Sequence, residues 1–461
     1  MKKLFTTLSV VMMAMAVNAQ SPRESSATTA REEIKANKYL AGSQYLDYNR
    51  RLPDKALTPA PKGYEPFYMS HYGRHGSRWL ISENSYIGPR NILRAAKDQD
   101  KLTPLGEETL RKIEAFEPTS VKRLGDLSTV GERQHHGIGK RMAQNFPEIF
   151  KAKNVPIDAR STTVNRCILS MIAECEELAA ANPTARFHND VSESLQYYLN
   201  QPWDGLVRET GRDRVERREV WRQKYTHPER LMKALFTDQQ WVFSNLRAGA
   251  FMRDLFEIAT NMQSHDTDIE LFSLFTEEEI YDLWKQNNIR WYLDYGPAPQ
   301  TKSLMPFSQR NLLRNIIETA DTVTQTQATL RFGHEVCVMP LACLLELDSC
   351  AVQVDNLEEL DLHWQNYKIF PMACNVQLIF YRPKKAANKR EKRELVRSSE
   401  REQARPEVKD KAGDILVKAL LNEREATLPI QTDQFPYYDW KTLRQYYLDK
   451  LDKFETLTSK Q

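Results

Sequence analysis

The feature that most constrains the fold is a long stretch, residues 186–325, with almost no strand-like pattern. It is rich in Trp, Arg, Glu and Leu, and it separates two regions in which short apolar runs alternate with helical spacing. A run of strand type precedes it at Pro66–His71, and another follows it at Leu330–Phe332. Alternation of strands and helices predicts an α/β fold. We therefore expect a discontinuous α/β core, residues 61–185 and 326–461, divided by an α-helical insert.

Shorter patterns within the core predict further elements. Val155–Ala159 is typical of a short strand, and Thr163–Ala181 has the spacing of a helix. The apolar face of that helix is expected at Cys167, Ile168, Met171, Ile172 and Leu178. Asp414–Leu421 (DILVKALL) fits a strand or a helix, because a short apolar run does not distinguish the two.

The N-terminus, residues 1–19, has the pattern of a secretory signal peptide. Lys2 and Lys3 precede a mostly apolar run, Leu4–Val17, which is followed by small or modest residues. The run is shorter than the roughly 20 residues that a membrane-spanning helix needs, and no other stretch reaches that length. We expect a secreted or periplasmic protein without a membrane span, whose polar residues 20–60 form an N-terminal arm. Export permits disulfides, but no pairing among the six Cys follows from their spacing.

The charge balance excludes a class of partner. Lys plus Arg is 65 and Asp plus Glu is 62, so the net charge is +3. A general nucleic-acid binder carries a much larger basic excess, so we expect no nucleic-acid partner. The strongest local excess is Arg382–Lys411, with 12 basic and 6 acidic residues. Such a run is usually solvated, which predicts a charged loop at residues 383–412.

The segment with the clearest chemical content is His71–Arg78 (HYGRHGSR). His75 lies between Arg74 and Arg78, and Arg is almost never buried without a partner. Two guanidinium groups can grip a phosphate bidentately. Their positive field lowers the pKa of an imidazole, which leaves a ring nitrogen free to attack. A basic surface turn is the alternative, and the spacing alone does not decide between them.

Two further segments carry candidate site residues. Arg166 follows a predicted strand at a helix start and could reach the same anion, although Arg is common at such positions. His334 and Glu335 follow a strand and a Gly, and could supply an anion donor and a general acid. Neither segment is specific by itself. His135 and His136 lie in a polar helical pattern, which favours solvated over catalytic side chains.

Together these segments resemble the histidine acid phosphatase family, branch 2 of the histidine phosphatase superfamily. Arg74–Arg78 matches its RHGxR signature, Arg160–Arg166 is similar to its RSTxxxR segment, and Gly333–Glu335 is similar to its second-half His segment. Asp414–Pro429 is most similar to multiple inositol polyphosphate phosphatases, the phytase-like members. The resemblance covers about residues 60–450. It implies a phosphoglycerate-mutase-like core, a mixed sheet flanked by helices, with an inserted α-helical domain.

The resemblance also implies an activity, the hydrolysis of phosphomonoesters through a phosphohistidine at His75, with inositol hexakisphosphate among the substrates. Glu335 would protonate the leaving alkoxide. The phosphoryl oxygens would be held by four side chains: Arg74, Arg78, Arg166 and His334. A small phosphorylated molecule is the implied partner, and neither a metal nor a cofactor is expected. The family's acid is Asp directly after the His or Glu two places on, whereas Glu335 directly follows His334.

A basic run in the insert, Arg208–Lys224, holds seven basic and four acidic residues. Members three or four apart share a helix face, so this run is a candidate contact for additional phosphates. The residues assigned to this role are Arg212, Arg214 and Arg218. An ordinary solvated helix is the alternative. For the whole protein the alternatives are a general acid or sugar phosphatase, a phosphoglycerate-mutase-like transferase, and an inactive phosphate-binding protein.

Overall fold

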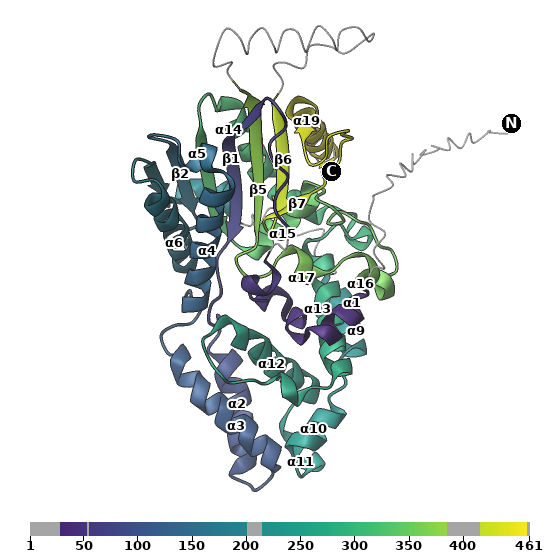
Figure 1. Cartoon of the computed structure of the whole chain (residues 1–461). Coiled ribbons are helices and arrows are strands. Elements are labelled where there is room, and N and C mark those ends of the chain that lie inside the picture. The colour runs from purple at the N-terminus through teal and green to yellow at the C-terminus, as the bar shows by residue number, and fades with distance from the viewer. Residues whose placement is uncertain (1–27, 53–54, 201–213, 385–414, 459–461) are drawn as a thin grey trace, which may run out of the picture.

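The computed structural model describes residues 28–52, 55–200, 214–384 and 415–458 (Figure 1). Three sequence expectations lie outside these ranges: the signal peptide at 1–19, all but the first two residues of the charged loop at 383–412, and Arg212. None of the described helices combines the length and the apolar character that a bilayer crossing requires.

A mixed sheet of eight strands forms the centre of one lobe, with the order β3-β2-β4-β1-β5-β6-β7 and with β8 paired to β6. The central strand β1 (Tyr64–Arg74) pairs parallel with β4 (Gln327–Gly333) and antiparallel with β5 (Asn375–Pro383). On its other side β4 pairs parallel with β2 (Pro156–Ser161). The remaining strands are β3 (Arg186–Asp190), β6 (Leu416–Leu421), β7 (Arg424–Ala426) and β8 (Tyr438–Asp439). Three neighbouring strands, β2, β4 and β1, are therefore parallel.

Helices cover both faces of this sheet, which buries its central strands on both sides (Figure 1). The helices around the sheet are α4 (Thr129–Asn145), α5 (Pro147–Phe150), α6 (Asn165–Ala181), α14 (Arg310–Thr322), α15 (Glu335–Leu344) and α19 (Trp440–Thr458). Successive side chains of a strand point to opposite faces. Accordingly, Tyr68 and Tyr72 of β1 join the core formed with α14, α15 and α19, whereas Met69 joins the core formed with α4 and α6.

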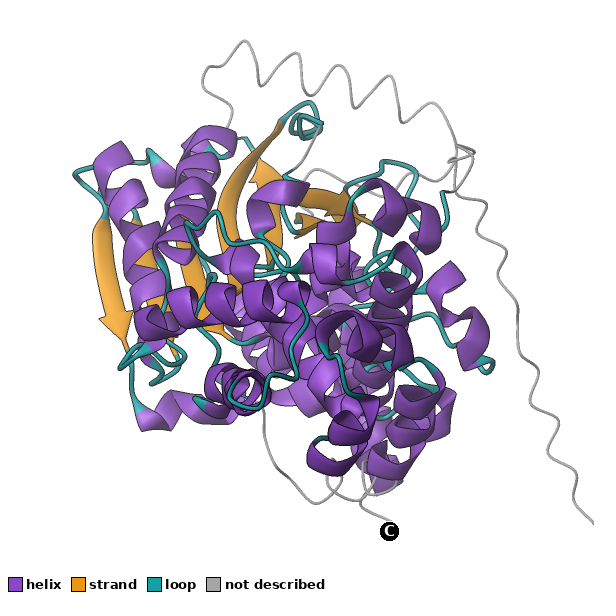
Figure 2. Ribbon diagram, turned by 90° about the horizontal axis from the view of Figure 1, so that it is seen from below, coloured by secondary structure: helices purple, strands orange, loops and turns teal. Residues whose placement is uncertain are grey.

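The second lobe is helical and has a hydrophobic core of its own. That core gathers residues from four parts of the chain, within 30–46, 80–116, 231–284 and 367–372. Its main helices are α1 (Ala30–Ala36), α2 (Asn84–Lys97), α3 (Pro104–Phe116), α10 (Glu229–Leu235), α11 (Gln239–Asn245), α12 (Ala248–Asn261) and α13 (Glu277–Tyr295). Figure 2, seen from this end of the molecule, shows helices across the whole lobe. We call this part the helical lobe.

The structure corrects or resolves three local expectations from the sequence. Residues 186–325 are not all helical, because β3 at their start pairs with β2. The ambiguous run at 414–421 contains strand β6. The predicted apolar face of α6 is wrong at Ile172, which is 41% exposed, whereas Cys175 lies on the buried face. Residues 30–46 of the expected N-terminal arm pack into the helical lobe, with Ile34 and Leu46 buried, whereas Tyr48 joins the core beside the sheet. All six Cys are buried and free of disulfides.

Candidate active site

The topology of the sheet brings the three sequence segments together. His75 directly follows β1, His334 directly follows β4, and Arg166 lies in the first turn of α6, just after β2. Because β2, β4 and β1 are parallel neighbours, their carboxyl ends meet at one edge, where α/β folds bind ligands. The main-chain NH of His75 also donates to the carbonyl of Gly333, at 3.0 Å, which joins the segments that follow β1 and β4 directly.

The ring of His75 is held in its neutral form. Its Nδ1 lies 2.8 Å from the carbonyl oxygen of Gly76. A carbonyl only accepts hydrogen bonds, so Nδ1 carries the proton and Nε2 keeps its lone pair. Burial is the largest cause that lowers the pKa of His75 well below its usual value, and the charges of Arg166, Arg74 and Arg78 lower it further. The side chain therefore offers a free Nε2 even in acid.

The guanidinium groups around His75 keep hydrogen-bond donors free for a ligand. Arg74 is fully buried, and its Nη1 donates to the carbonyls of Gln44 at 2.6 Å and Pro371 at 3.1 Å. Arg78 donates to the carbonyl of Trp79 at 2.9 Å. Within the described residues, these two side chains and Arg166 retain buried nitrogens without a hydrogen-bond partner. Such groups are rare in folded proteins and cost stability, so their presence around one histidine indicates an anion site.

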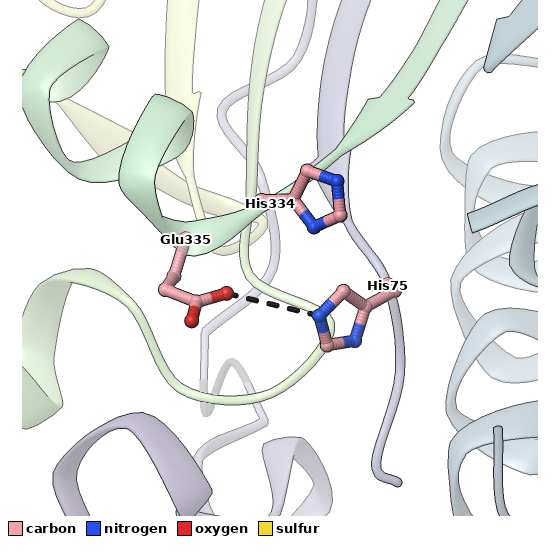
Figure 3. Close-up of side chains that lie close together, drawn as sticks. All are labelled: His75, His334 and Glu335. Carbon is pink, nitrogen blue, oxygen red and sulfur yellow. Dashed lines mark ion pairs between the residues drawn. The ribbon is translucent and has the colours of Figure 1, made fainter. Parts of the chain in front are cut away.

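The carboxylate of Glu335 points towards the ring of His75, as Figure 3 shows. Its Oε2 is 2.9 Å from Nε of Arg74 and 3.7 Å from Nε2 of His75. Burial raises the pKa of Glu335, but the charges of Arg74 and Arg78 outweigh it, and the pKa is about 2. Without a ligand, Glu335 is therefore a carboxylate that neutralises part of the arginine charge.

His334 completes the set, and all six side chains assigned to the core of the site come together. Its ring centroid lies 5.6 Å from that of His75, and Nε2 is 3.4 Å from Oγ1 of Thr162. Burial lowers the pKa of His334 to about 4. Ligand atoms of His75, His334 and Glu335 lie within 4.8 Å of one another, a spacing that a metal ion also needs. Three neighbouring guanidinium charges oppose a cation at this position and favour an anion.

The loop that carries His75 is fixed by side chains that the sequence did not single out. Ser170 of α6 accepts from the NH of Gly76 at 3.1 Å, and Gln134 of α4 accepts from the NH of Ser77 at 2.9 Å. A Cβ atom on Gly76 would come within 2.4 Å of the carbonyl oxygen of Gly131. Only glycine fits this close approach, which explains the Gly after His75.

A second buried polar cluster lies between β1, α4 and α6. His135 was expected to be solvated, and this expectation is wrong: the ring is buried and its Nδ1 lies 3.0 Å from Oε2 of Glu174. The other oxygen of Glu174 is 3.9 Å from Nδ1 of His71. The helical pattern contains few apolar residues near His135, but the close contact of α4 with α6 buries that face. His136 is partly buried and contacts Glu177 at 3.0 Å.

Acidification should unfold the protein, because several buried histidines stay neutral in the fold. Burial is the largest cause that lowers the pKa of His71, His265 and His334 from 6.5 to about 4. Between these values the unfolded chain binds protons that the folded chain does not. The free energy of unfolding is therefore largest above pH 6.5 and falls as the pH falls towards 4. Calorimetry across this range measures the effect.

The slope of stability against pH can be assigned with one variant. His265→Asn should flatten it by about one proton, because that ring binds a proton between pH 6.5 and 4 only in the unfolded chain. A midpoint temperature that does not change between pH 6.5 and 4 would contradict the prediction.

The three arginines assigned to the insert have different outcomes. Arg212 lies outside the described residues, and Arg214 begins helix α9 (Arg214–Lys224), but its side chain is not described. Arg218 lines a pocket of about 230 Å³ that also contains Arg222, Arg253 and Arg290. Gln44 and Tyr45 line the same pocket. Since Gln44 contacts Arg74, the pocket adjoins the site around His75.

A scan of protein-family models and a search of curated proteins found no match to the chain. Solved structures do match. The Bifidobacterium longum multiple inositol polyphosphate phosphatase in complex with phosphate has a TM-score of 0.69 at 18% identity, covering 89% of this chain and 97% of that chain. Its complex with inositol hexasulfate gives 0.67 at 17%, covering 89% and 97%. The phytase from D. castellii gives 0.61 at 12%, covering 89% and 85%.

This chain has the fold of these phosphatases. The expected fold class, a mixed sheet flanked by helices with an inserted helical domain, is confirmed. The resemblance to the phytase-like histidine acid phosphatases is confirmed at the level of the fold.

Proposed function

We propose that the protein is an exported histidine acid phosphatase that hydrolyses phosphomonoesters, including inositol polyphosphates, through a phosphohistidine. One observation carries this proposal: the neutral Nε2 of His75 lies among three arginines with unpaired buried donors and faces the carboxylate of Glu335. This arrangement combines a nucleophile, an anion site and an acid. Matched solved structures are phosphatases and phytases, which supports the same reaction.

The first step transfers the phosphoryl group to the enzyme. Nε2 of His75 attacks phosphorus, the N–P bond forms, and the P–O bond to the leaving alkoxide breaks. Arg74, Arg78 and Arg166 neutralise the charge that develops on the phosphoryl oxygens. Glu335 supplies the proton that the alkoxide needs. It acquires this proton when the substrate is bound, because a dianionic phosphate beside the carboxylate raises its pKa.

The second step releases phosphate. Glu335, now ionised, accepts a proton from a water molecule that attacks phosphorus, and the N–P bond breaks. His75 then recovers its lone pair and the cycle closes. No redox partner or nucleotide enters this balance, because water is the only co-reactant.

The basic pocket beside the site supports a polyphosphate substrate. Burial lowers the pKa of Arg253, and the charge of the nearby Arg222 lowers it further. Crowded like charges in a partly buried pocket attract an anion. Three of the four pocket arginines are partly neutralised: Arg222 pairs with Glu219 at 3.0 Å, and Arg218 and Arg290 share Asp294 at 2.9 and 3.6 Å. The structure of the B. longum enzyme was solved with inositol hexasulfate, a ligand similar in shape and charge to an inositol polyphosphate.

The proposed activity is tested by measuring free phosphate released from p-nitrophenyl phosphate and from inositol hexakisphosphate in buffer with a metal chelator. We expect release from both. Phosphate transfer to a second alcohol without free phosphate would indicate a mutase-like transferase instead. No turnover of any phosphomonoester, together with phosphate binding, would indicate an inactive binding protein.

Removing Arg222 and Arg253 together should separate polyphosphates from simple phosphates. Each charged hydrogen bond lost in a partly buried pocket costs about 1.5–3 kcal/mol, so KM for inositol hexakisphosphate should rise at least about tenfold. KM for p-nitrophenyl phosphate should change little, because that ligand reaches only the site at His75. Steady-state kinetics with both substrates measures the difference.

A matched control for this pair is Arg230→Ala, since Arg230 pairs with Glu279 in the helical lobe and does not line the pocket. It should leave both KM values unchanged. An equal loss on both substrates, or none on either, would argue against the pocket as a polyphosphate subsite and favour a general acid phosphatase.

Export is proposed from the sequence of residues 1–19 alone. A charged start followed by a short apolar run and small residues is typical of a cleaved signal peptide. Sequencing the N-terminus of the protein from its native host tests this, and an uncleaved Met1 would contradict it.

A further inference from the structure

The N-terminal segment 43–47 contacts the proposed phosphate site at several consecutive residues. The carbonyl of Gln44 accepts from Nη1 of Arg74 at 2.6 Å, the shortest of the three main-chain hydrogen bonds to that group. The next residue, Tyr45, places its ring 5.5 Å from the guanidinium carbon of Arg78. Two neighbouring residues thus contact the two arginines on either side of His75.

The remaining residues of the segment reach the loops around the nucleophile. Asp47 accepts from Nε2 of Gln134 at 2.7 Å, and the other end of that amide accepts from the NH of Ser77. The carbonyl of Leu46 accepts from the NH of Met372 at 2.9 Å, next to the carbonyls that also bind Arg74. Segment 43–47 therefore contacts Gln134, which holds the loop that carries His75, and the loop at Pro371–Met372.

The segment is anchored from the other side by the helical lobe. The hydroxyl of Tyr45 donates to Glu257 of α12 at 2.9 Å, and the side-chain oxygen of Gln44 accepts from Trp291 of α13 at 3.2 Å. Residues of two lobes thus fix the same short peptide, and through it the orientation of Arg74 and Arg78.

Ser43, at the start of the segment, has a backbone conformation that few residues other than glycine adopt. Its φ is 50° and its ψ is −111°. Strained backbone persists only where the surroundings hold it, and it concentrates at functional sites. Ser43 is fully buried, so the surrounding residues hold this conformation and fix the turn that leads into Gln44.

We infer that Gln44, Tyr45 and Asp47 are positioning residues of the active site, which hold Arg74, Arg78 and the His75 loop in the geometry that binds phosphate. They do not touch the reacting atoms. This inference rests on the proposed function, because it assigns phosphate binding to those arginines. Segment 43–47, which the sequence places in the N-terminal arm outside the α/β core, is thus part of the site.

The test uses Tyr45→Leu, which keeps apolar bulk but removes the aromatic face beneath Arg78. Dissociation constants for inorganic phosphate are measured by titration calorimetry, and KM and kcat with p-nitrophenyl phosphate. A lost cation–π contact should weaken phosphate binding and raise KM by about tenfold. Tyr45→Phe keeps the ring and should recover most of the affinity. Asn49→Ala is the matched control, because Asn49 is exposed two residues beyond the segment.

Because Tyr45 is buried, Asp47→Ala provides a second variant at a partly exposed position. It breaks the link to Gln134 and should raise KM several-fold, and Asp47→Asn should restore it because an acceptor oxygen remains. If folded Tyr45→Leu and Asp47→Ala proteins bind phosphate as the wild type does, the inference is overturned. If the wild type neither binds phosphate nor hydrolyses phosphomonoesters, the proposed function fails first, and the positioning role fails with it.

Discussion

His75→Ala should abolish phosphate release, with kcat lower by about 10⁴–10⁶-fold, the range seen when an enzyme loses its nucleophile. The reason is geometric. Nε2 of His75 carries the free lone pair that faces Glu335, and its partner Nδ1 is committed to the carbonyl of Gly76. A colorimetric assay for free phosphate, with p-nitrophenyl phosphate as substrate, measures the loss.

A covalent intermediate distinguishes a nucleophile from a residue that only binds. Phosphate bound to a histidine nitrogen survives alkali and is lost in acid, so a rapid alkaline quench of labelled substrate should trap label on the wild type and not on His75→Ala. His188→Ala, at an exposed ring away from the site, should label normally. Labelling of the His75→Ala protein would show that another group attacks phosphorus.

The fold could be predicted where burial produces a periodic pattern of apolar residues in the sequence. β1 and β4 carry that signal as apolar runs because helices bury them on both faces, and α6 carries it as helical spacing. β3 was missed because Arg186–Asp190 is a polar edge strand, with side chains exposed or only partly buried. Its pairing with β2 comes from tertiary structure, which no local pattern reports.

The clustering of the candidate site residues could be predicted where they carry charged or titratable side chains. The sequence patterns assign His75, its neighbouring arginines and the His334-Glu335 pair to one site, and the structure brings them together. The carbonyls of Gln44 and Pro371 that orient Arg74 could not be, since any residue has a carbonyl. The pocket arginines were found only in part. Arg218 lies in a basic run, but Arg253 lies far along the chain and reaches the pocket only through helix packing.

Glu335→Gln should separate two classes of substrate. An inositol phosphate leaves as an alkoxide that needs a proton, so kcat should fall by about 10²–10⁴-fold when the acid is lost. p-Nitrophenolate is a stable anion, so its departure should be nearly unaffected. The second step also needs Glu335, as a base towards water. A stopped-flow trace with p-nitrophenyl phosphate should therefore show one rapid equivalent of p-nitrophenolate followed by slow turnover.

Phosphate binding provides the control that assigns this loss to chemistry. The carboxylate of Glu335 lies 2.9 Å from Nε of Arg74 and competes with an anion for its charge. Gln removes that competition, so the dissociation constant for inorganic phosphate should stay the same or decrease. A weaker affinity would mean that Glu335 supports the arginines rather than the leaving group. Undiminished turnover of inositol hexakisphosphate would mean that another group, or the substrate's own proton, supplies the acid.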